Sequence, residues 1–154
     1  RDWGLIDRLP RLAAVQAEGA APFARGFAEG FRTRHRVKAE TIATAIRIGD
    51  PASWDRGAAA IRQTDGVVLA VPDQEILEAK RVIDQAGVGC EPASAASVAG
   101  LRRLVSQATV PPHHTVVAVL TGHLLKDPEI LLSTAEKPVE IEPTIDALEG
   151  VLRT

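Results

Sequence analysis

The sequence predicts an α/β protein with an open, twisted and mainly parallel sheet that is flanked by helices. Two observations support this fold class. Short apolar runs, several of them rich in β-branched residues, alternate along the chain with longer segments whose apolar residues recur at helical spacing. Because a helix lies between consecutive strands, we expect the strands to pair in parallel.

The expected elements extend along the whole chain and contain no internal repeat. In order, they are strand 12–17, helix 21–31, helix 53–66, strand 67–71, helix 72–87, helix 90–107, strand 115–120, a helix that starts at Pro128, a short edge strand early in the tail 138–154, and a helix from about Pro143. At 154 residues the chain has the length of one domain with a sizeable core.

The first four elements are bounded by clear turn signals. Residues 12–17 form an apolar run between a proline and a glycine, which is typical of a strand covered on both faces. Helix 21–31 is expected although it contains two glycines. Helix 53–66 begins at Ser53, whose hydroxyl can accept a backbone N–H, and closes at a glycine. Residues 67–71 are a strand by their β-branched content.

The next elements carry stronger helical signals. Helix 72–87 has Asp73 as its expected N-cap and acidic residues in its first turns. Its apolar residues fall on one stripe, namely Ile76, Leu77, Ala79, Val82 and Ile83. Helix 90–107 has Pro92 in its first helical position. Residues 115–120 are mostly β-branched or apolar and are expected to form a buried strand.

Composition excludes several classes of function. The 18 basic and 20 acidic residues give a formal charge of −2, so no global field favours nucleic acid or a membrane surface. No apolar run approaches the roughly 20 residues of a membrane span, and nothing resembles a signal peptide. Cys90 has no partner cysteine, which suits a reducing compartment and leads us to expect a cytoplasmic protein. The sequence contains no methionine, so we expect it to be part of a longer protein.

Two junctions are candidates for a functional site. Glu91 stands where the N-cap of helix 90–107 belongs, and the small residues after it would let another backbone or a flat ligand come close. The same pattern equally fits tight helix–sheet packing with Glu91 as a solvated cap. At the other junction, strand 115–120 ends on Thr121-Gly122-His123, and ligands of parallel sheets bind at the carboxyl ends of strands. Thr121 could instead cap the helix that follows.

Four segments resemble the threonine synthases in order and approximate spacing. They read LPRLAAVQAEGAAPF, ETIATAIRIGDPASW, CEPASAASVAGL and VVAVLTGHLLKDPE, and the resemblance covers residues 9–129. The family belongs to the fold-type II pyridoxal-phosphate enzymes. The resemblance implies that pyridoxal 5′-phosphate is the cofactor, that O-phospho-L-homoserine and water become L-threonine and phosphate, and that the enzyme is a homodimer without a metal.

The resemblance also implies roles for individual residues. Thr121 would face the pyridine nitrogen of the cofactor, because a hydroxyl can donate to a neutral ring nitrogen. Ala43 would lie close to the ring, in a loop of small residues, and Glu91 would lie near the face of the active site. No lysine stands in the family's Schiff-base context; the four are Lys38, Lys80, Lys126 and Lys137.

No glycine-rich phosphate cradle of the family type is present either. We therefore expect residues 1–154 to be the C-terminal portion of a fold-type II catalytic domain whose lysine-bearing N-terminal portion is absent, so that this chain holds no catalytic residue. Two alternatives remain, another fold-type II lyase such as a threonine or serine dehydratase, and a non-catalytic α/β module that kept only the scaffold.

Three features depart from the family pattern. Leu124 stands where a glycine is usual after the TGH sequence, and Asp50 stands where asparagine is common. The stretch 25–38 concentrates basic residues and is either an anion-binding or subunit-contact loop or a solvated, mobile surface loop; we favour the latter.

Overall fold

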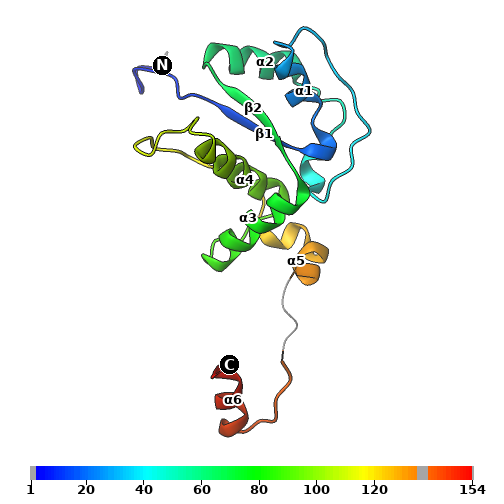
Figure 1. Ribbon diagram of the computed structural model, residues 1–154, viewed down its shortest axis with the longest axis vertical. Coiled ribbons are helices and arrows are strands. Elements are labelled where there is room, and N and C mark those ends of the chain that lie inside the picture. The colour runs from blue at the N-terminus through cyan, green and yellow to red at the C-terminus, as the bar shows by residue number, and fades with distance from the viewer. Residues whose placement is uncertain (1–2, 135–138, 154) are drawn as a thin grey trace.

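The computed structural model describes residues 3–134 and 139–153. Its sheet consists of β1 (Ala13–Ala17) and β2 (Val67–Val71), which pair in parallel with Ala13 opposite Val67 and Ala17 opposite Val71. Helices cover both faces of this sheet (Figure 1). The expectation of an α/β fold with a parallel sheet and flanking helices is therefore confirmed.

All six expected helices form, within a few residues of their expected limits. They are α1 (Pro22–Ala28), α2 (Trp54–Gln63), α3 (Asp73–Gln85), α4 (Pro92–Ser106), α5 (Pro128–Thr134) and α6 (Ile145–Leu152), with short 3₁₀ turns at Glu18–Ala20, Thr44–Ile46 and Leu124–Lys126. Among the described residues, no helix is both long enough and apolar enough to cross a bilayer.

Alternation along the strands divides the core into two clusters. On one face, Phe23, Trp54 and Ile61 of α1 and α2 pack on Val68. On the other face, mostly small residues of α3 and α4 pack on Ala17 and the end of β2. A methyl group added at Gly100 would lie 2.3 Å from a methyl carbon of Val15, so α4 approaches β1 as closely as a side-chain-free position allows.

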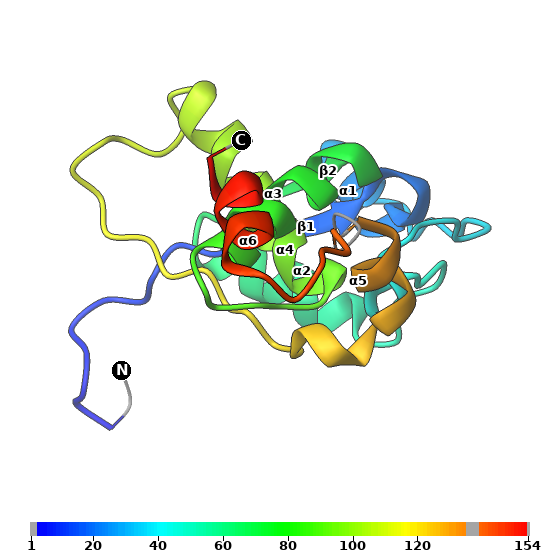
Figure 2. The same cartoon turned by 90° about the horizontal axis from the view of Figure 1, so that it is seen from below.

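The strand expected over residues 115–120 does not form, and this prediction is wrong for the described structure. Val116, Val117 and Val119 are 46%, 82% and 67% exposed. The segment has the composition of a buried strand, but a strand also needs a neighbouring strand to satisfy its N–H and C=O groups. The segment instead runs as irregular chain around the outside of the molecule between α4 and α5 (Figure 2).

The tail also differs from expectation. Residues 139–142, the described part of the expected edge strand, form no strand. Helix α6 does form, and the hydroxyl of its N-cap Thr144 accepts from the amide of Ala147 at 3.3 Å. Its apolar residues remain exposed, as Ile145 and Leu152 are each 75% exposed.

Two predicted caps are wrong in detail. Ser53 occupies the N-cap position of α2, but its side chain makes no capping hydrogen bond. Asp73 is the first residue of α3 rather than its cap, and its carboxylate accepts from the Thr41 hydroxyl and from the Ile42 amide at 3.0 Å. Asp73 therefore fixes the loop that precedes the Thr44–Ile46 turn.

The stripe on α3 also differs by one residue. Val82 is 54% exposed, whereas the side chain of Lys80 is only 2% exposed. The aliphatic stem of a lysine can take an apolar position when its ammonium group finds partners.

The basic stretch 25–38 lies at the surface with several of its charges paired. Arg34 donates to one oxygen of Asp50 at 2.7 and 3.1 Å, and Arg36 lies 3.0 Å from the other. His35 lies 3.1 Å from a carboxylate oxygen of Glu29. Asp50, one of the departures from the family pattern, thus serves as the shared partner of two arginines.

Candidate functional site

The connection between α3 and α4 places Glu91 at the start of α4. Gly87 and Gly89 adopt positive φ angles of 77° and 65°, which favour glycine and let the chain turn back sharply. Lys80 and Asp84 of α3 then hold both peptide groups of Cys90. The Lys80 ammonium donates to the Cys90 carbonyl at 2.8 Å, and the Cys90 amide donates to Asp84 Oδ1 at 3.3 Å.

Glu91 occupies the N-cap position of α4, as predicted, but it is not a solvated cap. Its side chain makes no capping hydrogen bond, and the residue is only 1% exposed. Its carbonyl accepts from the amides of Ser94 and Ala95 at 3.1 and 3.2 Å, which begins the helix. The buried carboxylate is therefore free to serve something other than the helix end.

The Thr121-Gly122 turn lies directly against this helix start. The Glu91 amide donates to the Gly122 carbonyl at 2.9 Å. In return, the amides of Thr121 and Gly122 both donate to Ser94 Oγ, at 2.9 and 3.0 Å. A methyl group at Gly122 would lie 2.1 Å from Glu91 Oε1, so only glycine allows this approach.

The residues at this contact form a small polar group, which we call the Glu91 cluster: Glu91, Ser94, Thr121, Gly122 and Lys126. The Thr121 hydroxyl lies 3.2 Å from Ser94 Oγ and donates to Glu91 Oε1 over 3.4 Å. The Lys126 ammonium lies 3.2 Å from Glu91 Oε2, close enough for an ion pair. The two groups are not aligned for a hydrogen bond, and among the described residues Oε2 accepts none.

The cluster combines buried and exposed members. Glu91 and Ser94 are 1% and 2% exposed, whereas Thr121 and Lys126 are exposed. Thr121 is thus an exposed residue whose hydroxyl lies against a buried polar base. Such an arrangement can bind a ligand that offers one hydrogen-bond acceptor.

The structure excludes the alternative role of Thr121 as a cap of the following helix, because the hydroxyl of Thr121 caps no described helix. The residue that caps the following 3₁₀ turn is His123, whose Nδ1 accepts from the Leu125 amide at 3.2 Å. Leu124 packs on Gly89, since a methyl group added there would lie 2.3 Å from its Cδ2.

Ala43 lies in the loop that Asp73 holds. It is fully buried and belongs to the core cluster that includes Ala95 and Ala96 of α4. Thr44, the next residue, is exposed, and its hydroxyl lies 3.1 Å from each carboxylate oxygen of Asp127. The loop and the segment after the Glu91 cluster are therefore linked by a hydrogen bond.

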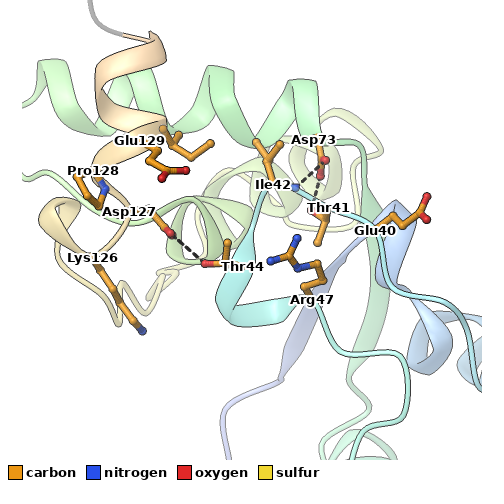
Figure 3. A pocket seen from close by; sticks show the side chains of 11 residues that line it. Glu40, Thr41, Ile42, Thr44, Arg47, Asp73, Lys126, Asp127, Pro128 and Glu129 are labelled. Carbon is orange, nitrogen blue, oxygen red and sulfur yellow. Dashed lines mark hydrogen bonds between the residues drawn. The ribbon is translucent and has the colours of Figure 1, made fainter.

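A hollow of about 730 Å³ opens between these two segments (Figure 3). Its charged lining residues are mostly acidic: Glu40, Asp73, Asp127 and Glu129 are carboxylates, and Arg47 and Lys126 are the two bases. Lys126 alone of the Glu91 cluster lines it, while Glu91, Ser94 and Thr121 do not. The hollow is therefore a neighbour of the cluster and not its binding space.

The residue that sequence reasoning missed is Ser94. Its partners lie 27 and 28 residues further along the chain, and no local pattern indicates them. The opening of α4 with small residues is the one signal present, and it predicts that another backbone or a flat ligand comes close to the helix. That interpretation holds, because the approaching group is the backbone of the Thr121-Gly122 turn.

Comparison with known proteins points to one family. The model of the family described as pyridoxal-phosphate dependent enzyme matches residues 3–122. The threonine synthase of Methanosarcina acetivorans is 42% identical over 151 residues, which are 97% of this chain and 37% of that protein. The threonine synthase of Synechocystis sp. is 48% identical over 141 residues, 91% of this chain and 35% of that protein. The chain thus spans little more than a third of the length of these curated relatives.

A solved structure shows the same fold. A fungal L-serine ammonia-lyase from Rhizomucor miehei superposes with a TM-score of 0.64 and 21% sequence identity, covering 87% of this chain and 43% of that one. At this identity the similarity shows the fold alone.

Proposed function

Because the chain belongs to the family of pyridoxal-phosphate dependent enzymes, we propose that it is the C-terminal portion of the catalytic domain of a threonine synthase. The observation that carries the proposal is the continuous match to threonine synthases across almost the whole chain. The complete enzyme would convert O-phospho-L-homoserine and water into L-threonine and inorganic phosphate.

The described residues fit one edge of the cofactor. A pyridine nitrogen without a proton needs a donor, and the hydroxyl of Thr121, an exposed residue, offers one. When bound, the cofactor supplies an electron-withdrawing ring that stabilises negative charge on the substrate. We propose that Thr121 holds and orients the ring nitrogen, and that Glu91, whose amide donates to the Gly122 carbonyl, holds the Thr121-Gly122 turn in place.

Ala43 has a more indirect place in this proposal. It is fully buried beneath the exposed Thr44 and packs on α4. We therefore assign Ala43 to the floor of the cofactor site, where a larger side chain would push the loop outward.

The lysine and the phosphate cradle would come from the N-terminal portion of the same enzyme. Each described lysine is already paired: Lys38 with Glu40 at 2.6 Å, Lys80 with Asp84 at 2.6 Å, and Lys126 with Glu91 at 3.2 Å. Lys137 lies outside the described residues. The exposed valines of residues 116–119 support the same idea, because a strand from that portion would cover them.

We also propose that the complete enzyme is a homodimer and works in the cytoplasm. Exposed apolar residues on α6 support the first point. The buried free thiol of Cys90 suits a reducing compartment and supports the second.

The test is an assay of the complete enzyme with three substrates. We expect phosphate and threonine to form in equal amounts from O-phospho-L-homoserine, and Thr121→Val to weaken this activity. Release of ammonia from serine or threonine, without turnover of O-phospho-L-homoserine, would favour the dehydratase instead. Absence of all three activities in a protein that folds would favour the non-catalytic module.

A further inference from the structure

We propose that Ser94 is a positioning residue that fixes the direction of the Thr121 hydroxyl, so that Thr121 acts as a donor toward the cofactor ring. The proposal rests on the proposed function, because that function supplies the ring nitrogen as the acceptor. It goes further in assigning a role to a residue that lies behind the site and does not touch the cofactor.

Ser94 uses all the hydrogen-bonding capacity of its hydroxyl at this contact. Its Oγ has three polar neighbours: the Thr121 amide at 2.9 Å, the Gly122 amide at 3.0 Å and the Thr121 hydroxyl at 3.2 Å. A serine hydroxyl has one proton and two lone pairs. Amides can only donate, so the two amides occupy both lone pairs. The proton of Ser94 is then directed to Thr121 Oγ1.

Since Thr121 Oγ1 accepts from Ser94, its own proton must point away from Ser94. The acceptor it finds in this structure is Glu91 Oε1, at 3.4 Å, which is long for a hydrogen bond between oxygens. The Thr121 proton is therefore available to a nearer acceptor on the exposed side.

A hydroxyl that is free to rotate can donate to an unprotonated ring nitrogen or accept from a protonated one. With Ser94 in place, one of the two lone pairs of Thr121 Oγ1 is occupied, so fewer accepting directions remain and the donating direction is favoured. Ser94 is 2% exposed, so bulk water does not compete for its bonds. Ser94 thereby favours the unprotonated ring nitrogen.

The chain offers a matched control. Ser97 lies on the same helix, and its hydroxyl donates to the Ser94 carbonyl at 2.7 Å. Ser97→Ala removes one hydroxyl from α4 without removing a bond to Thr121 or Gly122. Ser94→Thr keeps the hydroxyl and is the rescue variant.

The experiment uses the complete enzyme loaded with pyridoxal phosphate that carries ¹⁵N in its ring. The ¹⁵N chemical shift, followed against pH, reports whether the ring nitrogen is protonated. We expect the unprotonated shift near neutral pH in the wild type, in Ser97→Ala and in Ser94→Thr. In Ser94→Ala we expect the nitrogen to take up its proton at higher pH than in the wild type.

Every outcome bears on one proposal or the other. If Ser94→Ala binds the cofactor and titrates like the wild type, the role of Ser94 is refuted while Thr121 keeps its place. If Thr121→Val also leaves the ¹⁵N shift unchanged, the contact of Thr121 with the ring fails, and the proposed site fails with it. Should Ser94→Ala not fold, Ser94→Cys retains the volume with a weak donor, and its titration must also move toward higher pH.

Discussion

Gly122→Ala is the most direct test of the contact between the Thr121-Gly122 turn and α4. The added methyl group would lie 2.1 Å from Oε1, 2.2 Å from Cδ and 2.7 Å from Cγ of Glu91. Three atoms of one side chain are too close, so a small rotation of the carboxylate does not relieve the clash. Glu91 is 1% exposed and must either push the turn away or leave its position.

The magnitude follows from two opposing terms. Overpacking at a buried contact costs about 1–3 kcal/mol. Replacing glycine by alanine restricts the unfolded chain and contributes about 0.4–1 kcal/mol in the opposite direction. The φ angle of Gly122 is not in the left-handed region, so no backbone strain is added. We expect a net loss of roughly 0.5–2 kcal/mol, and with a slope of about 2 kcal/mol per molar urea the midpoint falls by roughly 0.3–1 M.

Gly150→Ala is the matched control. A methyl group at Gly150 meets nothing within 4 Å, and the residue lies inside α6. Alanine is favoured over glycine in a helix by about 0.5–1 kcal/mol, so this variant is expected to be neutral or to stabilise α6. Urea unfolding of both variants, followed by circular dichroism at low protein concentration, makes the comparison. A midpoint for Gly122→Ala at or above that of the wild type would refute the described contact.

Four further predictions concern the cofactor, pH and assembly. In the complete enzyme, Thr121→Val should weaken cofactor binding by about 2- to 13-fold, the equivalent of one hydrogen bond of roughly 0.5–1.5 kcal/mol. Thr121→Asp should lower the yield of threonine and alter the side products. If cofactor dissociation and threonine yield are unchanged in both variants, Thr121 is not part of the site. This chain alone, mixed with pyridoxal phosphate, should show no absorbance band of a lysine-bound cofactor, and a saturable, borohydride-trapped adduct on Lys126 would contradict this. The Arg103 guanidinium hydrogen-bonds both oxygens of Glu75 and holds the pKa of that carboxyl below its ordinary value. The pair therefore stabilises the fold above the ordinary glutamate pKa of about 4.3, and this contribution disappears as pH falls through the lowered value. Acid unfolding of Glu75→Gln should lack this component, and identical unfolding profiles for the variant and the wild type would argue against the pair. The chain alone should self-associate in sedimentation experiments, and Val117→Lys should reduce this self-association. A monomer at all protein concentrations would show that the exposed valines of residues 116–119 do not drive association.

Elements whose signals are local were predictable from the sequence. The helices α2, α3 and α4 were expected because their apolar spacing, terminal glycines and Pro92 all lie within the segments themselves. The strand over residues 115–120 was not obtained, because a strand is completed by a neighbour that its own composition cannot supply. The composition of the segment indicates that it is suited to burial, but it does not indicate whether a neighbouring strand is present.

The candidate site divides in the same way. Glu91 and Thr121 were singled out because they stand at the ends of predicted elements. Their contact with each other and with Ser94 depends on how a turn some 30 residues later returns to α4. The burial of Lys80 was missed because a charged side chain on a helix is ordinarily exposed, although Asp84 one turn later was a local hint of a partner.

The hydrogen bonds that Lys80 and Asp84 make with the backbone of Cys90 affect the reactivity of the Cys90 thiol. Cys90 is 1% exposed, and burial raises the pKa of its thiol, so little of the reactive thiolate forms while the turn stays closed. A thiol reagent can reach the sulfur only when the chain between α3 and α4 detaches from Lys80 and Asp84. The rate at which a thiol reagent labels Cys90 therefore measures how often this junction opens, and no engineered probe is needed.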